Sequence, residues 1–218
     1  AEPKKKPKQF VLNFGFFNLN SKITSEHTNS LLTLIQPQPV QSPDTPPIVE
    51  VELLKHCDDA ESQFKLGVCY LLGIETVPSV KTAIEELQKA SDKGHAVATY
   101  LIAVQQHEEL QKKDCKWKNQ QAPSSSVAWL EQLATQYQKA ILYFILGVCY
   151  EHGFGVTQNF EHAVRWYEMG AREGFPASQF QLAVCYLYGR GVAADFHKAV
   201  EWQKMAEQQD PQYKFEEE

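Results

Sequence analysis

The sequence predicts an all-α protein, an α/α solenoid of about four helix-hairpin repeats that follows an extended N-terminal tail. Three observations predict this class. The heptapeptide FILGVCY at residues 144–150 has near copies at residues 64–70 and 180–186. The small residue at the centre of each copy recurs after 36, 44 and 36 residues, at Gly67, Ala103, Gly147 and Ala183. A turn and a second helical stretch follow each copy. Recurrence of this kind indicates stacked repeats, each burying the face of its neighbour.

Residues 1–55 differ in character from the repeats. Seven of the eleven prolines lie at or before Pro47, and proline removes backbone donors and fixes φ, so residues 36–47 (QPQPVQSPDTPP) are expected to be an extended linker. Residues 10–19 are too apolar for a solvated tail, and we expect them to dock on the chain's own repeats or on a neighbouring subunit. The aromatic residues predicted to make that contact are Phe10, Phe14, Phe16 and Phe17. The predicted parts are therefore a proline-rich tail and linker (1–55), the solenoid (56–210) and an acidic C-terminal tail (211–218).

Each repeat is expected to hold two helices, the first of which carries the heptapeptide. Glycines then reverse the chain with positive φ, at Gly153, Gly155, Gly189 and Gly191. Capping residues that can accept the amides of the next turn follow at Ser79, Asn159 and Asp195, and in the second copy residues 124–126 (SSS) are expected to take this role. The second helices are predicted at residues 80–92, 127–138, 160–173 and 196–209.

The second copy contains an insertion. Its spacing of 44 residues, against 36 elsewhere, places eight extra residues in the polar stretch 112–126, which is predicted to be a loop. Trp117 stands in this loop between Lys116 and Lys118. It is either a loop residue that packs on the solenoid or an anchor for a partner.

The third and fourth copies resemble a known repeat. The pattern Leu-Gly-x-x-Tyr-x-x-Gly-x-Gly-Val-x-x-Asn/Asp-x-x-x-Ala-x-x-Trp at residues 146–166, and at 182–202 with Ala183 for the glycine, resembles the Sel1-like repeat, a relative of the tetratricopeptide repeat. The first copy departs at Glu75, which replaces the second loop glycine, and at Glu86, which stands for the tryptophan. The resemblance covers roughly residues 58–210. It implies an α/α solenoid that acts as an adaptor, scaffold or assembly factor without catalysis of its own.

In tetratricopeptide-like stacks the first helices line the concave side, so positions three and four residues apart on them are candidates for a groove. Phe64, Phe144 and Phe180 fall in this column, and they are interpreted either as inter-repeat core or as rungs of an apolar groove that accepts an apolar segment. The predicted protein-binding residues on these helices are Glu61, Tyr100, His107, Ile141, Glu151 and Leu187, with Trp117 from the insertion.

Other functions find little support in the residues. The formal charge of −6 does not indicate a nucleic-acid-binding surface, and no apolar run is long enough for a transmembrane helix. The cysteines and histidines are not spaced as metal ligands, and no nucleophile stands with a base and an orienting group. We therefore expect no catalytic residue, metal, cofactor or small-molecule substrate.

The predicted compartment is intracellular and reducing, since the five cysteines are odd in number and three of them occupy one packing position. The start at Ala1, followed by lysines, suggests a processed mitochondrial protein, with the cytoplasm as the alternative. The predicted function is a noncatalytic scaffold or adaptor, a structural subunit or assembly factor of a multi-subunit assembly. The alternative is a soluble signalling regulator that binds a client protein through the solenoid and can oligomerise.

Overall fold

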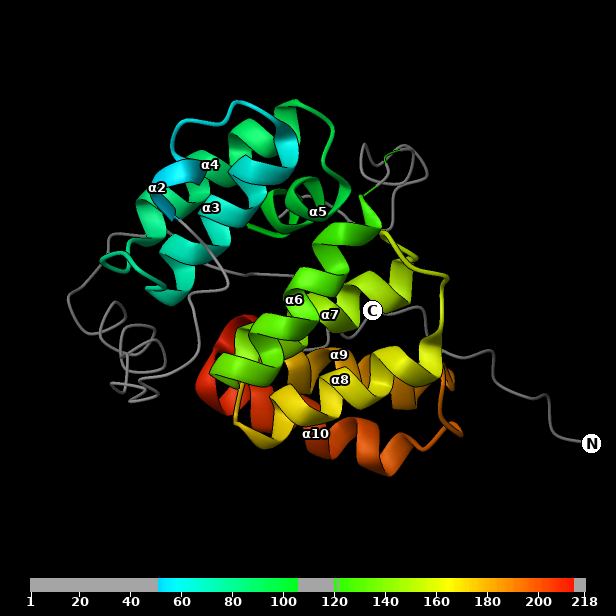
Figure 1. Cartoon of the computed structure of the whole chain (residues 1–218). Coiled ribbons are helices and arrows are strands. Elements are labelled where there is room, and N and C mark those ends of the chain that lie inside the picture. Colours follow the sequence, from blue (N-terminus) through cyan, green and yellow to red (C-terminus); the bar gives the residue numbers. More distant parts are fainter. Residues whose placement is uncertain (1–50, 106–119, 121, 214–218) are drawn as a thin grey trace, which may run out of the picture.

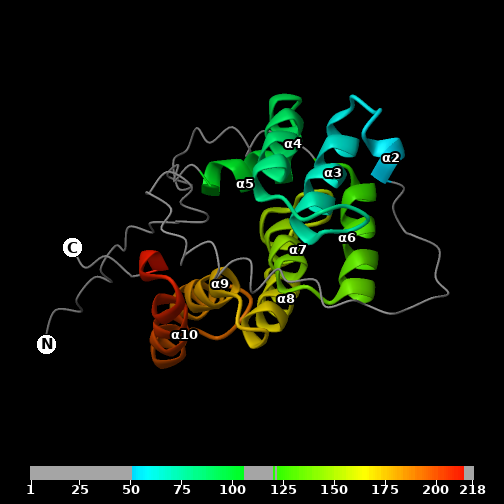
Figure 2. The same cartoon turned by 90° about the vertical axis from the view of Figure 1, so that its left-hand side faces the viewer.

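The computed structural model describes residues 51–105, 120 and 122–213, and within these ranges its regular secondary structure is helical and contains no strand. The helices follow one another in a stacked array, with α2, α3 and α4 at one end and α10 at the other (Figures 1 and 2). Their bounds are α2 Val51–Leu54, α3 Ala60–Leu72, α4 Val80–Asp92, α5 Ala96–Gln105, α6 Ser124–Tyr137, α7 Ala140–His152, α8 Phe160–Arg172, α9 Pro176–Tyr188 and α10 Phe196–Gln209, with the short 3₁₀ helix η2 at Pro211–Tyr213. The predicted α/α solenoid is thus confirmed.

Three pairs of helices form closely packed hairpins: α3 with α4, α7 with α8, and α9 with α10. The second repeat departs from this pattern, and Figure 2 shows α5 and α6 apart from each other. Instead α6 meets α3, where the Trp129 indole lies edge-on to Phe64 with ring centroids 6.4 Å apart. The Ser125 hydroxyl also donates a 2.8 Å hydrogen bond to Glu61 on α3. In the described part of the chain, α6 is therefore not paired with α5 as the second helix of a hairpin.

The predicted helix caps are confirmed in three repeats. The side-chain oxygens of Ser79, Asn159 and Asp195 accept hydrogen bonds from the backbone N–H three residues later, at 3.2, 3.0 and 3.1 Å. Such caps satisfy amides that have no partner within the helix. The prediction that a serine at residues 124–126 caps the second helix of the second repeat is wrong. Pro123 takes the capping position with no side-chain hydrogen bond, and the three serines form the first turn of α6.

The turn between paired helices requires glycine most strongly at Gly191. Its φ is +71°, and a Cβ there would lie 2.3 Å from the carbonyl oxygen of Phe160, at the start of α8. The turn of the fourth repeat thus sits directly on the second helix of the third. In the first repeat Glu75 stands at the corresponding place and still adopts a positive φ of 50°, a conformation that costs a residue with a Cβ more than it costs glycine.

The first helices form the centre of the core. Phe64, Phe144 and Phe180 are 0, 2 and 1% exposed, which supports their interpretation as inter-repeat core. Cys69, Cys149 and Cys185 are buried free thiols, and burial raises the pKa of Cys69 to about 12. These cysteines act as small apolar residues. No helix in the described part of the chain is long and apolar enough to cross a bilayer.

Candidate functional site

Two of the predicted binding residues lie in the core. Tyr100 on α5 is 2% exposed, and its hydroxyl accepts a 3.4 Å hydrogen bond from Gln181 on α9. Its ring also lies 5.0 Å, centroid to centroid, from the imidazole of His152 on α7. Tyr100 therefore joins the second repeat to the third and fourth.

Glu151, at the end of α7, is the second buried member of the predicted set, and only 6% of it is exposed. It accepts a 2.7 Å hydrogen bond from the Tyr167 hydroxyl on α8 and lies 3.5 Å from the guanidinium of Arg190, in the turn after α9. Burial, with the negative charge of Glu151 next in importance, raises the pKa of Tyr167 well above its ordinary value, so its hydroxyl stays a donor. Tyr100 and Glu151 are thus placed to hold repeats together, and their direct contact with a partner stays a prediction.

The other described members of the set are half-buried. Glu61 on α3 pairs with Lys65 at 2.7 Å and accepts the hydrogen bond from Ser125. Partial burial works to raise its pKa, but the hydrogen bonds from Lys65 and Ser125 hold that pKa below its ordinary value. Ile141 packs against the core from α7, and Leu187 lies near the end of α9.

The structure therefore does not gather Glu61, Ile141 and Leu187 with the buried pair into one exposed patch. The direct contact of Glu61, Ile141 and Leu187 with a protein partner remains a prediction. The remaining predicted residues fall outside the described ranges and are likewise untested: His107, Trp117, Phe10, Phe14, Phe16 and Phe17.

A cavity of about 310 Å³ lies at the N-terminal end of the array, between the turn after α2 and one face of the first hairpin. Its lining comes from Leu54, Lys55, His56, Cys57 and Asp58, from Gln63, Leu66 and Tyr70 on α3, and from Glu86 and Lys89 on α4. Sequence reasoning missed this site, because Gln63 and Lys89 look like ordinary surface positions of amphipathic helices. Within the described ranges, no group of acidic, histidine or cysteine side chains there or elsewhere is arranged to hold a metal ion.

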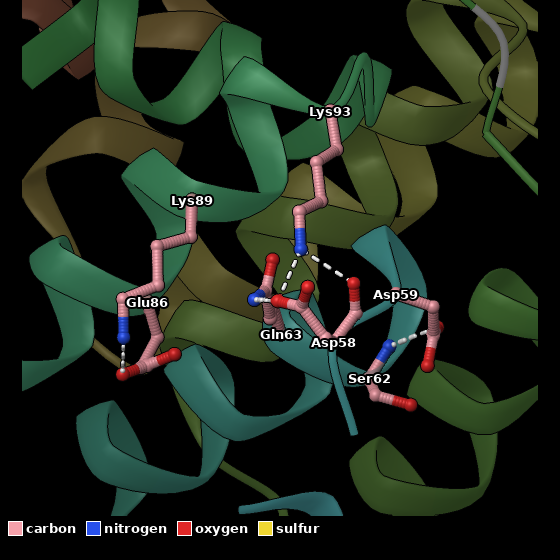
Figure 3. Close-up of polar contacts among 7 residues, drawn as sticks. All are labelled: Asp58, Asp59, Ser62, Gln63, Glu86, Lys89 and Lys93. Carbon is pink, nitrogen blue, oxygen red and sulfur yellow. Dashed lines mark hydrogen bonds and ion pairs between the residues drawn. The ribbon is translucent and has the colours of Figure 1, made fainter. Parts of the chain in front are cut away.

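The charged groups around this cavity are paired (Figure 3). The Lys93 ammonium binds both the carboxylate of Asp58, at 2.5 Å, and its backbone carbonyl. Lys93 thereby holds the pKa of Asp58 below its ordinary value. Lys89 pairs with Glu86 at 2.6 Å, and that hydrogen bond raises the pKa of Lys89. The side-chain amide of Gln63 donates to Asp58 at 3.0 Å.

Comparison with protein families finds the Sel1 repeat at residues 60–95, 140–175 and 176–211. The second copy, whose helices do not pair, is not among the three matches. No significant match to a curated protein sequence was found.

Comparison with solved structures also finds similar chains. The chain is similar to c5321, a protective antigen of uropathogenic Escherichia coli strains displaying an SLR fold (25% identity, TM-score 0.40, covering 74% of this chain and 34% of that one). It is also similar to a Sel1 repeat protein from Oxalobacter formigenes (25% identity, TM-score 0.38, 69% and 58%), and to cysteine rich protein B of Helicobacter pylori (18% identity, TM-score 0.38, 62% and 92%). The chain thus spans 34% and 58% of the length of the first two.

Proposed function

Because this chain is a Sel1-repeat protein, with three matched repeats, we propose that it is a noncatalytic protein-binding scaffold or adaptor, serving as a structural subunit or assembly factor of a larger complex. Sel1 repeats generally mediate protein–protein interactions. Repeat arrays of this type present extended surfaces, since each repeat packs mainly against its neighbours and leaves its outer faces free.

The observation that carries the proposal is a set of exposed apolar side chains that recurs from one repeat to the next. Phe160 at the start of α8 and Phe196 at the start of α10 occupy equivalent positions and are 36 and 65% exposed. Met169 and Met205 are likewise equivalent, and are 41 and 48% exposed. Single exposed apolar residues are ordinary, and the phenylalanine and the methionine of each helix are nine residues apart and therefore lie on opposite sides of it. The candidate contact surface is the methionine pair, which takes the same position on two successive second helices and whose flexible side chains adapt to a partner.

The apolar segment at residues 10–19 supports the same proposal from the sequence. It offers a second point of attachment, either to the chain's own repeats or to another subunit. Deleting residues 1–35 tests it: if the segment covers an apolar surface, the shortened chain should be less soluble and should bind more of a fluorescent apolar dye. A shortened chain that stays monomeric and binds no more dye contradicts this role.

The test of the proposed function is size-exclusion chromatography with mass spectrometry on protein from its native source. A structural subunit should elute with stoichiometric partners at a mass well above that of the 24.8 kDa chain. A chain that elutes alone, and binds a client only transiently, contradicts the structural-subunit role and favours the signalling regulator.

We also propose a reducing intracellular compartment, with the mitochondrion as the first candidate and the cytoplasm as the second. The support is that Cys69, Cys149 and Cys185 are free and buried in three different repeats, as expected where thiols stay reduced. Fractionation of source cells, with thiol counting on the purified protein, tests this assignment.

A further inference from the structure

One buried atom at the N-terminal cavity lacks a partner. Gln63 is 5% exposed, and its Nε2 donates to Asp58 at 3.0 Å. This bond fixes the orientation of the amide, because the reverse orientation would set its oxygen against a carboxylate. The oxygen Oε1 is buried and has no hydrogen-bond partner in the described structure. A buried acceptor of this kind is destabilising unless a donor reaches it.

The fourth repeat shows how the same position is normally satisfied. Gln179 corresponds to Gln63, and its Oε1 accepts a 2.9 Å hydrogen bond from Gln209. The residue of the first repeat that corresponds to Gln209 is Lys93, whose ammonium is bound to Asp58 instead. No hydrogen bond joins the Lys93 ammonium to Gln63 Oε1, so this acceptor can still receive a donor from outside.

The charges around the cavity decide what that group can be. Lys89 is paired with Glu86 at 2.6 Å, and Lys55 with Glu52 at 2.5 Å. A cationic ligand would meet the ammonium groups of Lys55 and Lys89, which line the cavity. An anion would bring no donor to Gln63 and would face the carboxylates of Asp58 and Glu86. A neutral group that carries both an N–H donor and a carbonyl acceptor avoids both conflicts.

We propose that this cavity binds a carboxamide, the side chain of an asparagine or glutamine in a partner polypeptide. Its N–H donates to Gln63 Oε1, its carbonyl accepts from the ammonium of Lys89 or Lys55, and its methylene groups lie against Leu66 and Tyr70, which also line the cavity. The cavity volume of about 310 Å³ leaves room for one such side chain. This inference rests on the proposed function, since it names the chemistry by which a protein partner is recognised.

The test uses N-acetylglutamine methylamide as a probe and N-acetylnorleucine methylamide as its control, because the two differ only where the carboxamide is replaced by an alkyl end. Each is titrated into the ¹⁵N-labelled full chain and followed by chemical-shift changes in two-dimensional NMR. The glutamine derivative should give saturable shifts at Leu66, Tyr70 and Lys89. The norleucine derivative should bind at least about tenfold more weakly, because the two share the same peptide N–H groups and only the glutamine side chain adds a donor for the buried acceptor.

Two variants locate the effect. Gln63→Met keeps the length of the side chain without the amide and should weaken binding of the glutamine derivative by about tenfold or more. Gln179→Met alters the equivalent residue, whose oxygen is already satisfied by Gln209, and should leave binding unchanged.

Equal binding of the two probes, or no binding of either, overturns the proposal and leaves only water at Gln63. That comparison needs no variant, so it decides the matter even if Gln63→Met fails to fold. If the chain retains its partners in size-exclusion chromatography but ignores the glutamine derivative, only this inference fails. If it has no partners at all, the proposed function fails.

Discussion

The imidazole of His95 stacks on the ring of Phe64, with centroids 4.3 Å apart and planes 17° apart. In the third repeat the corresponding contact joins Phe175 to Phe144, with centroids 5.8 Å apart. His95 thus takes a place that an apolar ring fills elsewhere in the array. It is 2% exposed, and its Nε2 lies 3.3 Å from the hydroxyl of Ser126 on α6.

This placement predicts a loss of stability in mild acid. Burial lowers the pKa of His95 from 6.5 to about 4, although the nearby carboxylate of Glu61 works to raise it and Lys65 to lower it. The unfolded chain therefore binds a proton more readily than the folded one. The contribution to stability is complete above about pH 6.5 and is lost as the pH falls toward 4.

The variant His95→Phe isolates this effect, since it removes the titrating group and restores the ring found in the third repeat. Between pH 7 and pH 5 the free energy of unfolding, measured with urea, should fall by about 2 kcal/mol more in the wild type than in the variant. Equal falls in the two proteins would show that His95 stays accessible to protonation in the folded state.

A second prediction concerns the buried carboxylate of Glu151. Glu151→Ala leaves the Tyr167 hydroxyl buried without its acceptor at 2.7 Å, and should reduce the free energy of unfolding by about 1 to 3 kcal/mol. Arg190→Ala removes a half-exposed ion-pair partner, together with its contact with the Tyr188 ring, and should cost less than about 1 kcal/mol. Chemical denaturation of the two variants provides the comparison. A larger loss in Arg190→Ala would mean that the ion pair, and not the tyrosine, determines the role of Glu151.

A third prediction concerns the close approach of α7 to α8. A Cβ on Gly147 would lie 2.3 Å from the ring of Tyr167, whereas on Gly67 it would meet the flexible side chain of Leu87 at 2.8 Å. Gly147→Ala should therefore destabilise the chain by about 1 to 3 kcal/mol, as overpacking typically does, and Gly67→Ala by less. In the fourth repeat alanine stands naturally at this position, and there the residue that corresponds to Tyr167 is Gln203. Thermal unfolding should give a lower midpoint temperature for Gly147→Ala than for Gly67→Ala. Equal midpoint temperatures would contradict this prediction.

The parts of the fold that could be predicted from the sequence are those determined locally. A capping side chain such as Asn159 acts within one turn of its own helix, so its position in the repeat is enough to identify it. The partner of α6 depends instead on what an insertion of eight residues allows, and no local pattern shows that Trp129 will meet Phe64 on α3. The candidate site was hidden for a similar reason. Gln63 stands out only once Lys93 is seen bound to Asp58, and the equivalent Gln179 bound to Gln209.

The last prediction tests the repeated apolar surface on α8 and α10. The first repeat carries Lys89 at the position of Met169 and Met205, so a lysine there is compatible with the fold. The double variant Met169→Lys, Met205→Lys should keep its unfolding free energy to within about 0.5 kcal/mol, because both side chains are exposed. It should nevertheless lose its partners in size-exclusion chromatography, since two ammonium groups would have to be desolvated in an apolar interface.

Glu161→Lys serves as the matched control. It changes the net charge by the same two units on an exposed position of α8, eight residues before Met169 and therefore more than two helical turns away from it, so it should leave the complex intact. If the double variant keeps its partners as fully as this control, the methionines lie outside the interface. The contact must then be made by another surface, of which the cavity around Gln63, at the opposite end of the array, is the first to examine.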